Sequence, residues 1–264
     1  MNKSLRVLIL ILLFGLATGC RPDLTTPIPT TLAITPPPGI PTLEGKLLNQ
    51  VNRLEDALPR ARSEGFVVPT DADLALFSRL ISDLRAGSPT DALTAAASRG
   101  YELFWYADKN DEGAVSYLLR ESDPASRGWG LYVLRVLPAS DVIIEAPHPI
   151  SDDGTPAVAV KMFRALDARA LLIAGAHRDA NKDGSADAAH SPQTVFEAVH
   201  EAELQAVLDN GAEAIVLQVH GFASNKHPEY PQVILAYEHG SLVNAFDLLK
   251  GPEIERKKIG RAHV

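Results

Sequence analysis

An alternation of apolar and amphipathic segments in the second half of this chain most constrains its fold. Short apolar runs predict strands, at residues 142–146, 170–174, 214–219 and 233–236. Helical patterns lie between and after them, at residues 155–166, 192–208 and 242–249. Strands that are apolar along their whole length are typical of a sheet covered by helices on both faces. We therefore expect an α/β fold with a mainly parallel or mixed sheet flanked by helices.

Two other patterns come before this alternation. Residues 44–99 carry apolar side chains at spacings of three and four, which predict a small helical subdomain for packing or docking. From residue 101 the period changes to two, and short strands are expected at 101–107, 115–120 and 130–137. The α/β domain is therefore expected to span residues 100–258.

The first twenty residues have the order of an export signal. Lys3 and Arg6 precede a short apolar run, which closes on Ala17-Thr18-Gly19-Cys20. This ending resembles the lipobox of bacterial lipoproteins, and Cys20 is the single cysteine of the chain. The resemblance implies a signal peptide over residues 1–19 and acyl chains on Cys20 that anchor the protein to a membrane. A plain signal peptide or a short buried helix is the alternative.

The resemblance also implies that the protein lies in the cell envelope. In a diderm host it implies the outer membrane, because Arg21 rather than Asp follows Cys20. Residues 20–43 are rich in proline and threonine, which is typical of an extended tether.

The last six residues, 259–264, resemble a translated sequencing adaptor, with an ordinary charged tail as the alternative. We expect a non-native tail and an incomplete α/β domain, and we leave His263 out of the functional argument.

Composition excludes two broad classes of protein. Hydrophobic residues make up 46% of the chain, which is too many for intrinsic disorder over most of its length. The 25 basic and 33 acidic side chains give a net charge of −8, which argues against a protein that binds nucleic acid through a broad basic face.

Histidines follow three of the predicted strands. His148, His177 and His220 each come just after an apolar run, so we expect them at one edge of the sheet. Asp152 and Asp153 follow His148, and one of them is expected to be a metal ligand. The alternative is that both are charges favoured at the start of a helix capped by Thr155. Two histidines, a carboxylate and an open position form the usual hydrolytic zinc site.

Between positions 141 and 240 the chain has, in order, a strand-end His with a following acid, a strand-end Arg-x-x-Asn, a helix that bears a His and a last strand-end His. This order resembles that of N-formylglutamate amidohydrolases. It is also similar to poly-γ-glutamate hydrolases and, more remotely, to zinc carboxypeptidases of the same α/β architecture. The resemblance implies a zinc site and a substrate pocket. Its zinc ligands would be His148, Asp152 or Asp153, and His220, with Asp152 the better match. Its pocket residues would be Arg178 on a substrate carboxylate, Asn181 beside it, and His200 facing the site from a helix. The alternative for His200 is the polar face of that helix.

The function implied is hydrolysis of an amide or peptide bond next to a carboxylate, on a small molecule or a peptide. These families use a late glutamate as general base, and neither Glu238, Glu253 nor Glu255 matches its position. The base therefore lies beyond residue 258 or is missing. A missing base would favour a non-catalytic lipoprotein that binds a ligand.

Two further patterns give alternatives. His220-Gly221 resembles the oxyanion loop of serine α/β-hydrolases, although no G-x-S-x-G elbow follows it. Residues 179–187 fit the first nine positions of a calcium loop. The calcium ligands of this loop would be Asp179, Asn181, Asp183 and Asp187. The twelfth position of that loop is His190, a poor calcium ligand, and a solvated turn is the alternative. In a zinc hydrolase, Asp187 and His190 would close the pocket.

Overall fold

A mixed sheet organises the part of the chain that the structure describes, which is residues 34–122 and 127–221 of a computed structural model. Its seven strands lie in the order β1-β2-β3-β4-β6-β5-β7. Their bounds are β1 (Thr42–Gly45), β2 (Tyr101–Asp108), β3 (Val115–Glu121), β4 (Leu131–Arg135), β5 (Val142–Ala146), β6 (Ala170–Ile173) and β7 (Ile215–Gln218). The predicted α/β class, with a mixed sheet flanked by helices, is confirmed.

The sheet has a parallel part and an antiparallel part. From β2 to β6 along the sheet, each strand pairs antiparallel with the next, whereas β6, β5 and β7 are parallel to one another and β1 is parallel to β2. Ile144 in the middle of β5 is in register with Leu171 of β6 and Leu217 of β7. Because these three strands point the same way, the loops after them leave the same edge of the sheet.

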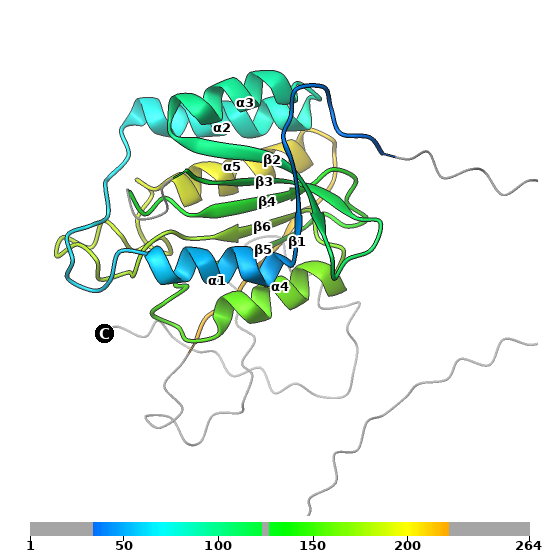
Figure 1. Cartoon of the computed structure of the whole chain (residues 1–264). Helices are drawn as coiled ribbons and strands as arrows, with labels where there is room; N and C mark the ends of the chain where they lie inside the picture. Colours follow the sequence, from blue (N-terminus) through cyan, green and yellow to red (C-terminus); the bar gives the residue numbers. More distant parts are fainter. Residues whose placement is uncertain (1–33, 123–126, 222–264) are drawn as a thin grey trace, which may run out of the picture. The chain divides into compact units, whose positions relative to one another are not determined.

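Five helices of the described residues cover the two faces of the sheet. Their bounds are α1 (Leu47–Ala57), α2 (Asp71–Arg85), α3 (Pro89–Ser98), α4 (Thr155–Ala165) and α5 (Val195–Leu208). Figure 1 shows α1 and α4 on one face and α2, α3 and α5 on the other. Two apolar clusters match these layers, one packing α1 and α4 on the sheet and the other packing the remaining three helices.

The helices take the positions that their apolar spacing predicts. Leu47, Val51 and Leu54 of α1 are buried, as three- and four-residue spacing requires. At the start of α2, the Thr70 side chain accepts from the backbone N–H of Asp73, whose carboxylate accepts from the Thr70 N–H. Residues 44–99, expected to form a helical subdomain, thus cover both faces of the same sheet.

A buried ion-pair network ties α2 to α5 and the sheet. The carboxylate of Glu203 is fully buried and accepts from the guanidinium groups of Arg85, at 2.8 Å, and Arg169, at 2.9 Å. Arg85 also donates to the backbone carbonyl of Arg135 at the end of β4, 2.7 Å away. Two guanidinium groups on one carboxylate compensate the cost of removing that charge from water.

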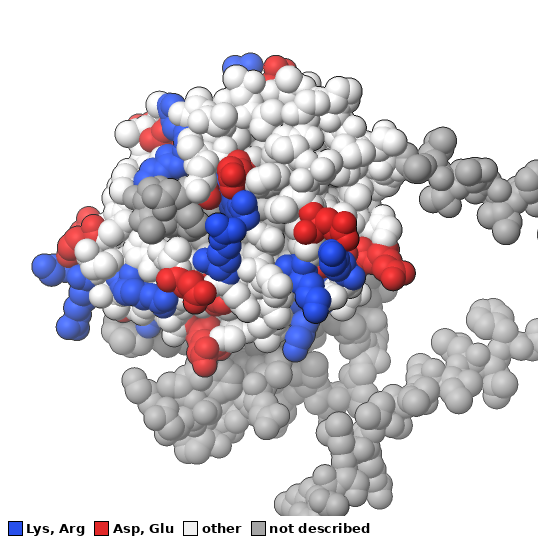
Figure 2. Space-filling model, viewed as in Figure 1, with Lys and Arg blue, Asp and Glu red and all other residues white. Residues whose placement is uncertain are grey.

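Most predicted elements agree with the observed ones to within a few residues. The exceptions are the tether, since β1 begins at Thr42 within its predicted range, and the cap of α4, which is Gly154 rather than Thr155. Gly154 has φ +78°, a conformation that favours glycine. The strand predicted at 233–236 and the helix predicted at 242–249 lie outside the described residues. On the face drawn in Figure 2, basic and acidic side chains are interspersed.

Candidate metal centre

Histidines follow the three parallel strands at their common edge. His148 lies after β5, His177 after β6 and His220 after β7. Because β5 lies between the other two strands, the segments after β5 and β7 are neighbours. The ring centroids of His148 and His220 are 5.1 Å apart, with an interplanar angle of 69°. The structure therefore brings two of the three histidines together.

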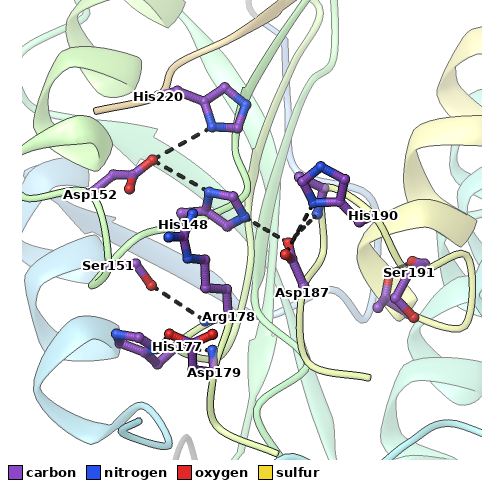
Figure 3. Close-up of polar contacts among 12 residues, drawn as sticks. His148, Ser151, Asp152, His177, Arg178, Asp179, Asp187, His190, Ser191 and His220 are labelled. Atoms are coloured by element: carbon purple, nitrogen blue, oxygen red, sulfur yellow. Dashed lines mark hydrogen bonds and ion pairs between the residues drawn. The ribbon is translucent and has the colours of Figure 1, made fainter. Parts of the chain in front are cut away.

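His177 stays within its own loop. Its Nδ1 atom accepts a hydrogen bond from the backbone N–H of Asp179, at 3.0 Å. Its own backbone N–H donates to the carbonyl of Pro59 in the loop after α1. His177 thus helps to hold two loops together and lies apart from the other two histidines (Figure 3).

Asp152 is the carboxylate that lies between His148 and His220. Its Oδ2 atom is 3.4 Å from His148 Nδ1 and 3.5 Å from His220 Nδ1. The loop holds it there, because the backbone N–H of Asp152 donates to the His148 carbonyl and the hydroxyl of Thr155 donates to the Asp152 carbonyl. Asp153, the other predicted ligand, is exposed and belongs to neither group of possible metal ligands.

A second carboxylate contacts His148 from its other side. His148 is only 2% exposed, and its Nε2 atom lies 2.7 Å from Asp187 Oδ1. The other oxygen of Asp187 lies 3.0 Å from His190 Nδ1. Burial alone would raise the pKa of Asp187, but the hydrogen bonds and charges of the two histidines outweigh it and hold that pKa at about 2. Asp187 is therefore a carboxylate at neutral pH.

Two groups of possible metal ligands share His148. One comprises His148, Asp152 and His220, the other His148, Asp187 and His190, and in each the ligand atoms lie within 4.8 Å of one another. Figure 3 shows the two groups on opposite sides of the His148 ring. The structure thus holds His/Asp groups, centred on one buried histidine, that can bind a metal ion.

The two groups differ in how fully their atoms are already paired. In the second group, the contacts of 2.7 and 3.0 Å are ordinary hydrogen bonds. In the first, the buried Nδ1 atom of His148 has no hydrogen-bond partner among the described residues. A buried nitrogen without a hydrogen-bond partner is costly, so the first group has an unused ligand atom that a metal ion could bind.

The spacing of the first group also suits a metal ion. Two ligand atoms at about 2.05 Å from one ion, in tetrahedral geometry, lie roughly 3.3 Å from each other. The observed distances from Asp152 Oδ2 to the two Nδ1 atoms are 3.4 and 3.5 Å. Both nitrogens therefore already lie at about ligand spacing from Asp152, and all three ligand atoms lie within 4.8 Å of one another.

Gln218 and Glu145 lie behind His220. The Nε2 atom of His220 is 3.2 Å from the side-chain oxygen of Gln218, whose amide nitrogen donates to Glu145 at 2.8 Å. Burial, followed by the charge of nearby His148, lowers the pKa of His220, although Asp152 opposes this shift.

His200 is not placed beside the ligand groups. Its Nδ1 atom donates to the buried Glu145 carboxylate at 2.6 Å, and this hydrogen bond raises the pKa of His200. His200 thus contacts an acid of the sheet through Nδ1, with its side chain 17% exposed. A role facing the substrate stays a prediction.

Arg178 and Asn181 occupy the loop after β6, but with different roles. Arg178 is exposed, its backbone N–H donates to Ser151 Oγ at 3.3 Å, and its side chain extends toward the side of the site that holds His148 (Figure 3). The amide of Asn181 instead donates to the carbonyl of Phe66 and to Ser185 Oγ. Arg178 is thus available to a ligand, whereas Asn181 ties the loop to its neighbour.

The four predicted calcium ligands each make contacts of their own. Asp183 accepts hydrogen bonds from the backbone and hydroxyl of Ser185, and Asp187 turns toward the histidines. The amide nitrogen of Asn181 is used in holding the loop, and Asp179 lies 3.9 Å from His177. Among the described residues, the acids of this run form no ligand group of their own. These contacts favour the alternative, a hydrogen-bonded turn, and the calcium loop stays a prediction.

Sequence reasoning missed the pairing of Asp187 with His148 and the role of Glu145. The signal for Glu145 was present, because a charged residue within an apolar strand requires a buried partner. Cys20, Glu238, Glu253 and Glu255 lie outside the described residues. Within the described ranges, no helix is long and apolar enough to cross a membrane. In comparisons with known proteins, no family model, curated protein or solved structure matches this chain.

Proposed function

We propose that this protein is a zinc-dependent hydrolase of an amide or peptide bond next to a substrate carboxylate. The observation that carries the proposal is the buried, unpartnered Nδ1 atom of His148, which faces Asp152 and His220 at a spacing that fits one ion. The resemblance of the same residues to N-formylglutamate amidohydrolases and poly-γ-glutamate hydrolases supports it.

The donor set favours zinc over calcium or magnesium. Two imidazole nitrogens and one carboxylate oxygen suit zinc, whereas calcium and magnesium prefer oxygen ligands alone. A zinc ion held by three protein ligands keeps an open position, polarises a carbonyl and lowers the pKa of water. The half-exposed His220 leaves the site accessible from solvent, as a substrate requires.

Asp187 supports the proposed centre as an outer partner. A carboxylate accepts hydrogen bonds, so the Nε2 atom of His148 donates to Asp187, and in a neutral His148 the Nδ1 atom is then free to bind the metal. Carboxylates that accept from the second nitrogen of a metal-binding histidine fix its tautomer and orientation. The second group of possible ligands is thereby assigned to holding His148 in place.

Arg178 is the proposed contact for the substrate carboxylate. A guanidinium group can donate two parallel hydrogen bonds to a carboxylate, which fixes both position and orientation. The side chain is exposed at the edge of the sheet that carries the ligand groups. No glutamate of the described residues joins either group, so the residues proposed to act are the three metal ligands and Arg178.

A lipid on Cys20 is proposed to attach the protein to a membrane. The Ala17-Thr18-Gly19-Cys20 ending supports acylation of Cys20 and attachment to the cell envelope, at the outer membrane in a diderm host. The net charge of −8 supports a small molecule or peptide, rather than nucleic acid, as the ligand. Incorporation of labelled palmitate that is lost in Cys20→Ala would support the anchor, and equal labelling of both chains would overturn it.

The catalytic proposal is tested with paired substrates. The full chain, loaded with zinc, is assayed on acyl amino acids and γ-linked dipeptides with a free carboxylate and on the same compounds with that group amidated. We expect hydrolysis of the free acids, and Arg178→Ala should raise KM for them while Lys182→Ala, an exposed neighbour, should not. Zinc-independent turnover, or equal rates on free and amidated substrates, would contradict the proposal.

A further inference from the structure

Glu145 is a buried acid that has no part in the proposed catalytic site. It lies on β5, the middle one of the three parallel strands, and is fully buried. Its two carboxylate oxygens have one donor each, the Nδ1 atom of His200 at 2.6 Å and the amide nitrogen of Gln218 at 2.8 Å. A buried carboxylate with two donors is held in one orientation.

The Glu145 carboxylate determines which way the amide of Gln218 points. An ionised carboxylate only accepts hydrogen bonds, so the NH₂ group of Gln218 must face it. The oxygen of Gln218 then lies on the opposite side of the amide, 3.2 Å from the Nε2 atom of His220. His200 contacts the other oxygen of the same carboxylate through its Nδ1 atom, at 2.6 Å.

The Gln218 oxygen in turn determines the tautomer of His220. A carbonyl oxygen only accepts, so the Nε2 atom of His220 must carry the hydrogen. In a neutral imidazole the other nitrogen then has the free lone pair. That nitrogen is the Nδ1 atom, which lies 3.5 Å from Asp152 Oδ2.

We propose that Glu145 is a positioning residue that acts through Gln218 to hold His220 in the tautomer whose Nδ1 atom binds metal. His148 has the same arrangement, since Asp187 accepts from its Nε2 atom and leaves its Nδ1 atom free. Both ligand histidines thus present Nδ1 to the same point. This inference rests on the metal centre proposed above.

The test combines nitrogen NMR with zinc titration on the full chain. In the metal-free protein at mildly alkaline pH, where free histidine is neutral, ¹⁵N shifts and two-bond ¹H–¹⁵N correlations distinguish the two tautomers. We expect His220 to be protonated at Nε2 in the wild type. Glu145→Gln allows the Gln218 amide to turn over, and we expect mixed tautomers and about a 10- to 100-fold loss of zinc affinity.

Two further variants complete the design. Gln218→Met removes the acceptor at an exposed position, so it should fold even if Glu145→Gln does not, and it should have the same two effects. Glu213→Gln is the matched control, because it makes the same change at an exposed acid just before β7. It should leave both the tautomer and the zinc affinity unchanged.

The outcomes separate this inference from the proposed function. Protonation of His220 at Nδ1 in the wild type, or a tautomer that neither Glu145→Gln nor Gln218→Met alters, would overturn the positioning role even if zinc binds. Failure of the wild type to bind zinc, with His220 protonated at Nε2 and the variants mixed, would instead overturn the metal centre and leave the hydrogen-bond relay supported.

Discussion

The Nε2 atom of His148 donates a 2.7 Å hydrogen bond to Asp187, a residue on the long loop between β6 and α5. This contact sets the buried histidine against a carboxylate and directs its other nitrogen toward Asp152 and His220. Removing Asp187 should therefore loosen His148 without removing a metal ligand.

We predict that Asp187→Ala lowers zinc affinity by about 10- to 100-fold, the effect typical of an outer partner. Isothermal titration calorimetry of the full chain measures it. His190→Ala is the matched variant, since His190 contacts Asp187 at 3.0 Å but is 76% exposed, and it should alter the affinity only slightly. If His190→Ala abolished zinc binding, the metal would lie in the second ligand group.

Asp152 and Asp153 are adjacent acids whose substitutions should affect zinc affinity differently. Asp152→Asn should lower zinc affinity by more than the roughly 10- to 100-fold effect of an outer partner, because it removes a ligand. Asp153→Asn changes the same charge on an exposed side chain and should leave zinc affinity near the wild-type value. Equal losses in the two variants would point to a general effect of charge and against ligation by Asp152.

Glu203 should be essential for stability. Glu203→Ala leaves the guanidinium groups of Arg85 and Arg169 without their buried acid, and we expect it to lower the free energy of unfolding by about 3–5 kcal/mol. Glu201→Ala, at an exposed position of the same helix, should change it by less than about 0.5 kcal/mol. Urea denaturation measures both, and a small loss in Glu203→Ala would show that the network contributes little.

The cap of α2 should make stability depend on pH. Burial acts to raise the pKa of Asp73, but hydrogen bonds from Thr70 and Arg99 outweigh it and lower that pKa. A lowered pKa in the folded chain stabilises at neutral pH, and this contribution is lost as the pH falls through the folded pKa.

Asp73→Asn should therefore cost about 1 kcal/mol near pH 7, a typical value for a helix cap. The difference from the wild type should shrink as the pH falls below the ordinary carboxyl range. Denaturation curves across this range measure it, with the exposed Asp71→Asn as the control. A difference that stays constant with pH would show that the Asp73 charge is not involved.

The hydrophobic pattern predicted the helices and strands around the site well, because strands buried on both faces are apolar along their whole length. The strand predicted at 142–146 and the observed β5 have the same bounds, and α5 lies within its predicted range. Strand order and direction in the first half were not predictable, because antiparallel pairing of β2 to β4 depends on long-range contacts. β1 was missed because four residues after a proline-rich segment carry too short a pattern.

The candidate site was predictable where its residues follow a strand directly or lie in the short loop after it. His148 and His220 follow strands whose parallel pairing brings them together, and Asp152 lies in the loop between β5 and α4. Asp187 comes from a long loop between β6 and α5, whose path no periodic pattern records. The contact of His200 with Glu145 was not predictable, because the spacing of apolar residues on α5 does not reveal a buried acid on β5.

The central claim is that His148, Asp152 and His220 bind one zinc ion. The most direct measurement is the zinc content, by mass spectrometry, of the purified full chain and of His220→Ala and His190→Ala after equilibration with zinc and removal of excess metal. We predict stoichiometric zinc in the wild type and in His190→Ala, and its loss in a folded His220→Ala. A folded wild type without zinc, or a His220→Ala that retains it, would contradict the account.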